Sequence, residues 1–150
     1  MKRSGFFLLL VLSLVVSLPA WANNSKCEQV GGVLMTNINA VEGVTNLGPV
    51  FGDLQGSVAA TIMGQSHGGY DIQHYWVTAS GDTIKLKLAH LTPTLAGDAV
   101  AVQWGDYRSE IAGGTGKFKN ATGYLDYFGL ADFNQLTLVL RYRGVVCFQQ

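Results

Sequence analysis

The feature that most constrains the fold is a succession of short runs in which apolar and polar residues alternate, with no helical periodicity of useful length after residue 22. The clearest run is 83–91, where Lys85 and Lys87 share one face. The opposite face of this run carries Ile84, Leu86, Leu88 and His90. Because successive side chains of a strand point to opposite faces, the pattern predicts a half-buried strand with its lysines in solvent.

Further runs of this kind predict about eight strands, separated by Gly, Asn, Asp and Ser at hairpin-like spacing. They span residues 33–38, 54–63, 70–78, 99–107, 124–130 and 135–146, with 108–112 leading into a glycine-rich turn. No crossover helix lies between them, which favours an antiparallel barrel or sandwich over an α/β fold. We expect an all-β chain with a single eight-stranded antiparallel β-barrel of calycin-like type, filled by its own side chains or holding one small ligand.

Residues 1–22 have the layout of a secretory signal peptide. Lys2 and Arg3 precede an almost wholly apolar run at 6–18, Pro19 breaks it, and Ala20-Trp21-Ala22 supplies a small-x-small cleavage site. An uncleaved membrane anchor is the alternative, but the apolar run is shorter than the ~20 residues that a spanning helix needs. We expect cleavage after Ala22, no membrane span in the mature chain, one barrel domain over 23–150, and a secreted or periplasmic location.

Charge and cysteine content narrow the function classes. Removing Lys2 and Arg3 from ten basic residues leaves eight against ten acidic residues, a net charge of −2. No basic stripe is present, so we expect no nucleic-acid partner. Cys27 and Cys147 lie near the two ends of the mature chain, and an oxidising compartment favours a disulfide between them over two free thiols. Such a bond would join the first and last strands of a barrel.

Two short motifs invite a catalytic interpretation that their context does not support. The run 113–117, Gly-Gly-Thr-Gly-Lys, lacks the glycine spacing, the following Ser or Thr and the helix of a phosphate-binding loop, so a turn between strands is the better interpretation. The run 64–68, Gly-Gln-Ser-His-Gly, matches the G-x-S-x-G pattern of a nucleophile elbow. That elbow requires a strand–turn–helix, whereas a strand follows here, so an esterase function of Ser66 is not favoured.

Candidate site residues come from the bulky or polar positions of the predicted strands. The candidates for a ligand cavity are His74, Trp76, His90, Trp104 and Tyr142. Each could equally fill the barrel, and the histidines could be hydrogen-bonded core residues. Asp106 is a polar candidate if it faces inward and a solvated strand end if it does not. The histidines have no metal-ligand spacing, so we expect no metal and no other cofactor.

The residues around the glycine-rich turn resemble a known family. Residues 110–118 and 121–124, with Trp104-Gly105-Asp106-Tyr107 before them and 142–146 after them, are similar to the glycine-rich hairpin of dirigent proteins and of allene oxide cyclases. The resemblance implies a secreted, bacterial member of this barrel group with a hydrophobic cavity, a homotrimeric assembly, and relatives that guide cyclisations or couplings of apolar molecules. Allene oxide cyclases place polar residues near the first strand, a region where this chain has Asn37 and Asn39, with Glu42 the nearest carboxylate.

Two functional hypotheses follow. The first is a secreted barrel that binds a small hydrophobic molecule, as a cyclase, an isomerase or a dirigent-type enzyme that holds its ligand in one conformer. The alternative is a non-catalytic extracytoplasmic barrel with a partner-binding or structural role. A cavity with a buried polar cluster would favour the first, and a solid core with an exposed apolar patch the second.

Overall fold

A computed structural model describes residues 25–41 and 44–149. The predicted signal peptide at 1–22 and Glu42 lie outside the described residues. The strands are β1 (Ser25–Val41), β2 (Val44–Gly52), β3 (Gly56–Ser66), β4 (Gly69–Thr78), β5 (Thr83–Leu86), β6 (Ala89–Leu91), β7 (Thr94–Ala96), β8 (Ala99–Val102), β9 (Arg108–Gly114), β10 (Thr122–Asp132) and β11 (Thr137–Gln149). A short 3-10 helix, η1 (Gly116–Phe118), lies between β9 and β10. No helix in this described part is long and apolar enough to cross a membrane.

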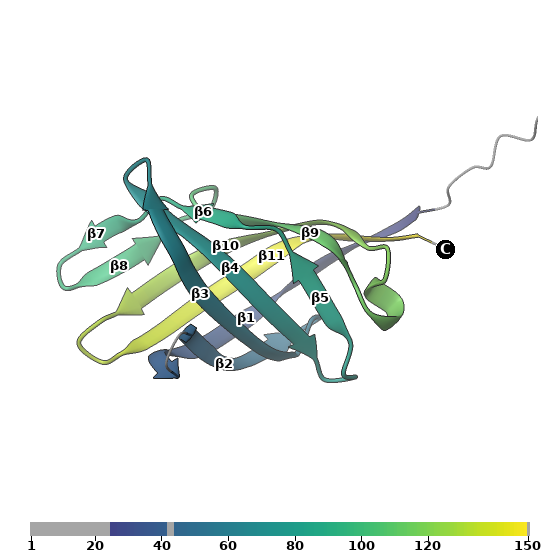
Figure 1. The fold of residues 1–150 in the computed structure, drawn as a ribbon, viewed down its shortest axis with the longest axis horizontal. Coiled ribbons are helices and arrows are strands. Elements are labelled where there is room, and N and C mark those ends of the chain that lie inside the picture. The colour runs from purple at the N-terminus through teal and green to yellow at the C-terminus, as the bar shows by residue number, and fades with distance from the viewer. Residues whose placement is uncertain (1–24, 42–43, 150) are drawn as a thin grey trace, which may run out of the picture.

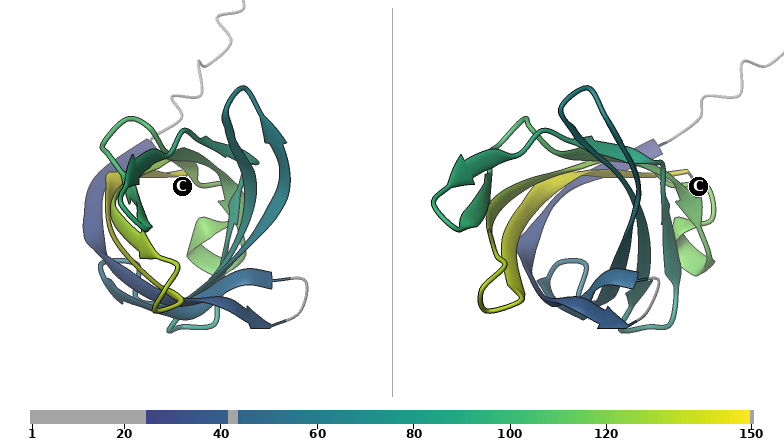
Figure 2. Two further views of the ribbon diagram at one scale, coloured as in Figure 1. Left: turned by 90° about the vertical axis from the view of Figure 1, so that its left-hand side faces the viewer. Right: turned by 60° about the vertical axis from the view of Figure 1, so that its left-hand side comes forward.

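The strands close into an antiparallel barrel, which confirms the predicted fold class (Figure 1). Eight strand positions follow one another around the ring, in the order β1, β2, β3, β4, β5, β9, β10 and β11. Pairing of β11 with β1 completes the closure, so neither strand is left with an unpaired edge. The ring is visible end-on in the left view of Figure 2. The hairpin of β7 and β8 extends the wall, because β8 pairs with β10 beyond the end of β9.

The strand predicted over 83–91 is interrupted, and this reverses its inward face. β5 and β6 both pair with β4, but the chain leaves strand geometry at Lys87 and Leu88. Before the break Ile84 and Leu86 are buried; after it Leu88 is exposed, and Ala89 and Leu91 are buried instead. The predicted inward position of His90 is therefore wrong, because its two neighbours in the chain take the inward face.

The disulfide joins the two strands that close the barrel. Cys27 on β1 and Cys147 on β11 are direct register partners and form the predicted bond, across a sequence separation of 120 residues. The β1–β11 ladder continues from this point as far as the pair Asn37 and Thr137. The bond thus fixes one end of the closing seam.

The glycine-rich stretch forms a tight connection, as the turn interpretation predicts. It leads from β9 through η1 into β10, and among the described residues no helix longer than η1 follows it. Gly116 has φ of +50°, and a Cβ atom there would lie 1.9 Å from a carboxylate oxygen of Asp82. Just after it, Phe118 is fully buried and packs against Phe148 near the disulfide end of the barrel.

Two large aromatic side chains fill the barrel interior on that side of the cavity. Trp76 and Tyr142 meet edge to face with ring centroids 5.4 Å apart. Both side chains hydrogen-bond the backbone of Leu54. The Trp76 indole N–H donates to the Leu54 carbonyl at 3.0 Å, and the Leu54 backbone N–H donates to the Tyr142 hydroxyl at 3.0 Å. These two large side chains fill the space between opposite walls and leave no polar atom of their own unpaired.

Candidate functional site

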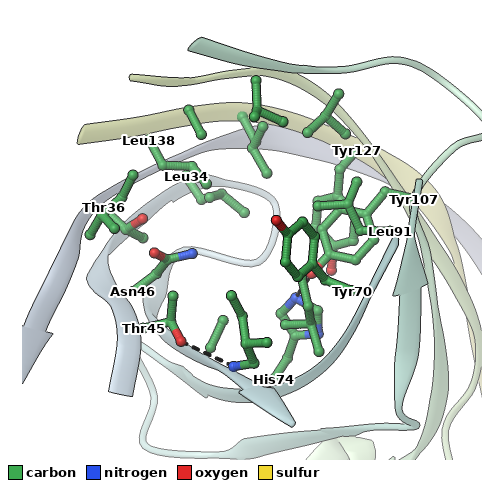
Figure 3. A pocket seen from close by; sticks show the side chains of 18 of the residues that line it. Leu34, Thr36, Thr45, Asn46, Tyr70, His74, Leu91, Tyr107, Tyr127 and Leu138 are labelled. Atoms are coloured by element: carbon green, nitrogen blue, oxygen red, sulfur yellow. Dashed lines mark hydrogen bonds between the residues drawn. The ribbon is translucent and has the colours of Figure 1, made fainter. Parts of the chain in front are cut away.

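The other end of the barrel contains a cavity of about 160 Å³ (Figure 3). Its wall is mostly apolar and is built from inward-facing residues of β1 to β4, β6, β8, β10 and β11, with Tyr107 just before β9 and Phe133 just after β10. The second half of β1 lines it, whereas Cys27 near the start of β1 does not, so the cavity lies away from the disulfide. Ile62 and Phe133 line it while remaining exposed to solvent, and they mark the mouth.

A small residue, Ala60, occupies an inward position on β3 and leaves space for the cavity. Strand pairing places Asn46, Ala60 and His74 side by side on β2, β3 and β4. With strands about 4.8 Å apart, the alanine separates two polar side chains whose Cα atoms are about 10 Å from each other.

A buried polar group forms the deep wall of the cavity. The Tyr107 hydroxyl and His74 Nε2 are 2.5 Å apart, and Ser109 Oγ lies 3.3 Å from His74 Nδ1. All three residues are buried, and among the described residues no carboxylate hydrogen-bonds to this histidine. Burial lowers the pKa of His74 from its ordinary value of 6.5 to about 4, so the ring is neutral near pH 7. Burial also raises the pKa of Tyr107 well above its usual range, and its hydroxyl keeps its proton.

Tyr127 completes this group. Its ring stacks on His74 with centroids 5.8 Å apart and packs on Tyr107 at 4.7 Å. Burial raises the pKa of Tyr127, and the nearby Ser109 hydroxyl acts in the opposite direction. The Tyr127 and Ser109 hydroxyls do not meet ordinary hydrogen-bond geometry, so the Tyr127 hydroxyl is buried without a hydrogen-bond partner. In this group, histidine and tyrosine act as neutral hydrogen-bonding groups.

Two further buried oxygens on the cavity wall lack partners. They are Thr36 Oγ1 on β1 and Asn46 Oδ1 on β2, and Figure 3 shows both side chains across the cavity from His74, Tyr107 and Tyr127. Within the described residues, every buried side-chain oxygen or nitrogen found without a partner belongs to a residue that lines this cavity. Since buried polar groups are normally paired, the cavity is where the molecule has unused hydrogen-bonding capacity.

The sequence-predicted candidates do not gather around this cavity. His74 lies on its wall, while Trp76 and Tyr142 pack in the closed end. Trp104 stacks on Phe128 outside the cavity, with the Arg143 guanidinium 4.2 Å from its ring centroid. Asp106 lies in the turn before Tyr107 and does not line the cavity, and Asn37 and Asn39 are exposed on β1.

His90 belongs to a separate group at the β3–β4 hairpin. Its Nδ1 and Asp71 Oδ1 are 2.9 Å apart, and Ser66 Oγ donates to the other carboxylate oxygen at 2.9 Å. These contacts lower the pKa of Asp71. The serine of the G-x-S-x-G pattern thus bonds to a carboxylate rather than to a histidine, in a hairpin turn rather than before a helix. Within the described residues, no cluster of three or more histidine, cysteine or acidic side chains could hold a metal ion.

Sequence reasoning missed most of the polar wall. Tyr70 shares the alternation of His74, so its inward position was visible in the sequence. Tyr107 is the last residue of the predicted strand 99–107, and no sequence pattern favours it over Trp104, three residues earlier, as a cavity residue. Thr36, Asn46 and Tyr127 carry no motif, and only the pairing of distant strands brings them to one cavity.

Comparisons with known proteins find a structural similarity to a solved protein but no sequence match. No family model matches this sequence, and no curated protein matches it. Among the solved structures that match is the pterocarpan synthase dirigent protein GePTS1. The match has a TM-score of 0.45 and 15% sequence identity, and it covers 93% of this chain and 98% of that one. The barrel described above rests on the strand pairing of this chain itself.

Proposed function

We propose that this protein binds a small, largely apolar molecule in the open half of its barrel. We propose further that residues 1–22 direct the chain to an extracytoplasmic compartment and are then cleaved. The observation that carries the proposal is an apolar cavity that leads to the buried His74 and Tyr107. Its volume of about 160 Å³ is below the ~300 Å³ of ordinary ligand pockets and close to that of engineered cavities that hold benzene. The ligand is therefore the size of a single ring, or one apolar end of a longer molecule that enters at Phe133.

The polar wall favours orientation of the ligand over strong acid–base chemistry. With its pKa near 4, neutral His74 is a weak base, and Tyr107 with a raised pKa is a weak acid. Both nitrogens of His74 are already paired with Tyr107 and Ser109, so the Tyr107 hydroxyl, held in place by His74, is the atom of this pair that can hydrogen-bond the ligand. A cyclase, an isomerase or a dirigent-type protein built on this cavity would act mainly by fixing one conformer. The sequence resemblance to the dirigent and allene oxide cyclase barrels supports the same proposal.

The test is a titration with p-xylene, followed by amide chemical shifts in NMR spectra. We expect saturable shifts at cavity residues in the wild-type protein. Ala60→Leu should abolish them, because the added side chain occupies the space between Asn46 and His74. Ala59→Leu is the matched control, since residue 59 faces outward on the same strand. Wild-type protein without saturable shifts, or equal binding by both variants, would refute the proposal.

The second candidate function is binding of a partner through the outer face, as a non-catalytic barrel. The observation in its favour is an exposed apolar row on adjacent strands, in which Val139 pairs with both Leu130 and Met35. A homo-oligomer such as a trimer could cover this row. Met35→Lys and Val139→Lys should then convert an assembly to monomers in light scattering, whereas an unchanged mass would count against this use of the face.

A further inference from the structure

The Thr36 and Asn46 side chains form a pair on the cavity wall. Strand pairing places Asn46 opposite Ile38, two residues along β1 from Thr36, so the pair are diagonal neighbours on the inner face. Diagonal neighbours have Cα atoms about 7–8 Å apart, a gap that one ligand oxygen can bridge. Figure 3 shows the two side chains next to each other at the cavity. Thr36 is only 4% exposed, and neither its Oγ1 nor Asn46 Oδ1 has a partner.

The hydrogen-bonding roles of these atoms define what they can bind. Asn46 Oδ1 only accepts, so it requires a donor from the ligand. The Thr36 hydroxyl can donate to a ligand oxygen as well as accept. A hydroxyl group satisfies both, since its O–H donates to Asn46 and its oxygen accepts from Thr36. A carbonyl satisfies only Thr36, and a hydrocarbon satisfies neither.

We propose that Thr36 and Asn46 form a subsite for a hydroxyl group, and that the ligand is a small aliphatic alcohol whose carbon skeleton packs on the apolar wall. The inference rests on the proposed function, because it names the class of molecule that the cavity takes. The skeleton would lie along Leu34, Ala60 and Leu138, which line the cavity near the pair. Leaving the pair unoccupied keeps two polar oxygens buried without partners, so a bound hydroxyl group removes that penalty.

The experiment compares three ligands of matched size: cyclopentanol, cyclopentanone and methylcyclopentane. Each is titrated into the wild-type protein, Thr36→Val, Asn46→Leu and Tyr127→Phe, with dissociation constants from amide chemical shifts. Because an alcohol gives up hydrogen bonds to water that a hydrocarbon never makes, each ligand is compared between proteins rather than with another ligand. Thr137→Val, an exposed position on β11, is the control for the threonine substitution.

The subsite predicts a specific pattern. Thr36→Val and Asn46→Leu each weaken cyclopentanol roughly ten-fold, as expected for a lost buried hydrogen bond. Thr36→Val also weakens cyclopentanone, but Asn46→Leu does not, because a ketone has no proton to donate. Methylcyclopentane binds all variants as well as the wild type, which shows that the cavity remains intact.

Three outcomes overturn one proposal or the other. If none of the three ligands binds the wild-type protein, the proposed function itself fails. If all bind and neither Thr36→Val nor Asn46→Leu weakens cyclopentanol, the hydroxyl subsite is wrong while the cavity function stands. If only Tyr127→Phe weakens cyclopentanol, the hydroxyl group is held at the His74 side, and the subsite at Thr36 and Asn46 is again wrong.

Discussion

As the pH falls, the free energy of unfolding of this protein should decrease through His74 before the protein's carboxylates are protonated. The buried ring has a pKa of about 4, against an ordinary value of 6.5 for the unfolded chain. Between these values the unfolded state binds a proton that the folded state does not, so the free energy of unfolding falls as the pH falls. At 1.36 kcal/mol per pKa unit, the loss from about pH 6.5 to about pH 4 is about 3 kcal/mol.

The measurement is a series of urea unfolding curves across this pH range for the wild type and His74→Gln, with the disulfide intact. Glutamine can still hydrogen-bond but does not titrate, so the slope of unfolding free energy against pH should flatten in the variant even if its stability near neutral pH is lower. Asp71 and Glu110 have lowered pKa values, so their contributions are lost mainly below about pH 4.5. Both proteins share these carboxylates, and the difference between the two slopes isolates His74.

His67 provides the control for this prediction. It is exposed at the β3–β4 turn with φ of +47°, a conformation that asparagine tolerates, so His67→Asn should leave the slope as in the wild type. A flat wild-type profile between about pH 6.5 and 4, or the same slope in wild type and His74→Gln, would show that burial of this ring does not oppose its protonation.

Two further predictions concern the closed end of the barrel. Cys27→Ser with Cys147→Ser should lower the free energy of unfolding by up to about 5 kcal/mol, the loop-entropy value for a separation of 120 residues, and urea unfolding of this variant against the oxidised protein measures it. An unchanged midpoint would mean that the β1–β11 ladder alone constrains the closure. Trp76→Phe should cost about 1–3 kcal/mol because the buried Leu54 carbonyl loses its donor, yet leave p-xylene binding unchanged, since Trp76 does not line the cavity. Loss of p-xylene binding would contradict the division of the interior into two halves.

The barrel could be predicted because its strands alternate and its turns carry glycine and polar residues. The disulfide followed from the compartment and from the need of a barrel to join its first and last strands. The main error of the strand prediction lies between the expected strands 33–38 and 54–63, where no strand is predicted and the structure contains β2. Gly48, Pro49 and Gly52 explain this error, because residues typical of turns occupy a strand whose close approach to β1 requires Gly48.

The cavity was harder to predict because it depends on register and on residue size together. Alternation indicates that His74 and Trp76 face the same side of their strand, but it does not indicate that Ala60, on the preceding strand, lies opposite His74. The break at Lys87 and Leu88 sends His90 outward, and no pattern in the run 83–91 marks that break. Tyr107, just before β9, and Tyr127 on β10 reach His74 on β4 only because the closed ring brings these strands together, with the Tyr127 N–H donating to the Tyr107 carbonyl.

The open half of the barrel has a cost in stability that the disulfide can offset. Unfilled apolar volume costs about 24 cal/mol per Å³, so a cavity of about 160 Å³ corresponds to about 4 kcal/mol. The bond between Cys27 and Cys147 contributes a stabilisation of the same size, up to about 5 kcal/mol. Because the bond fixes the closed end beside Phe118 and Phe148, it stabilises the ring without occupying the cavity. A cavity that arose only from poor packing would be closed by a larger residue at position 60, whereas a binding site requires the small residue that is found there.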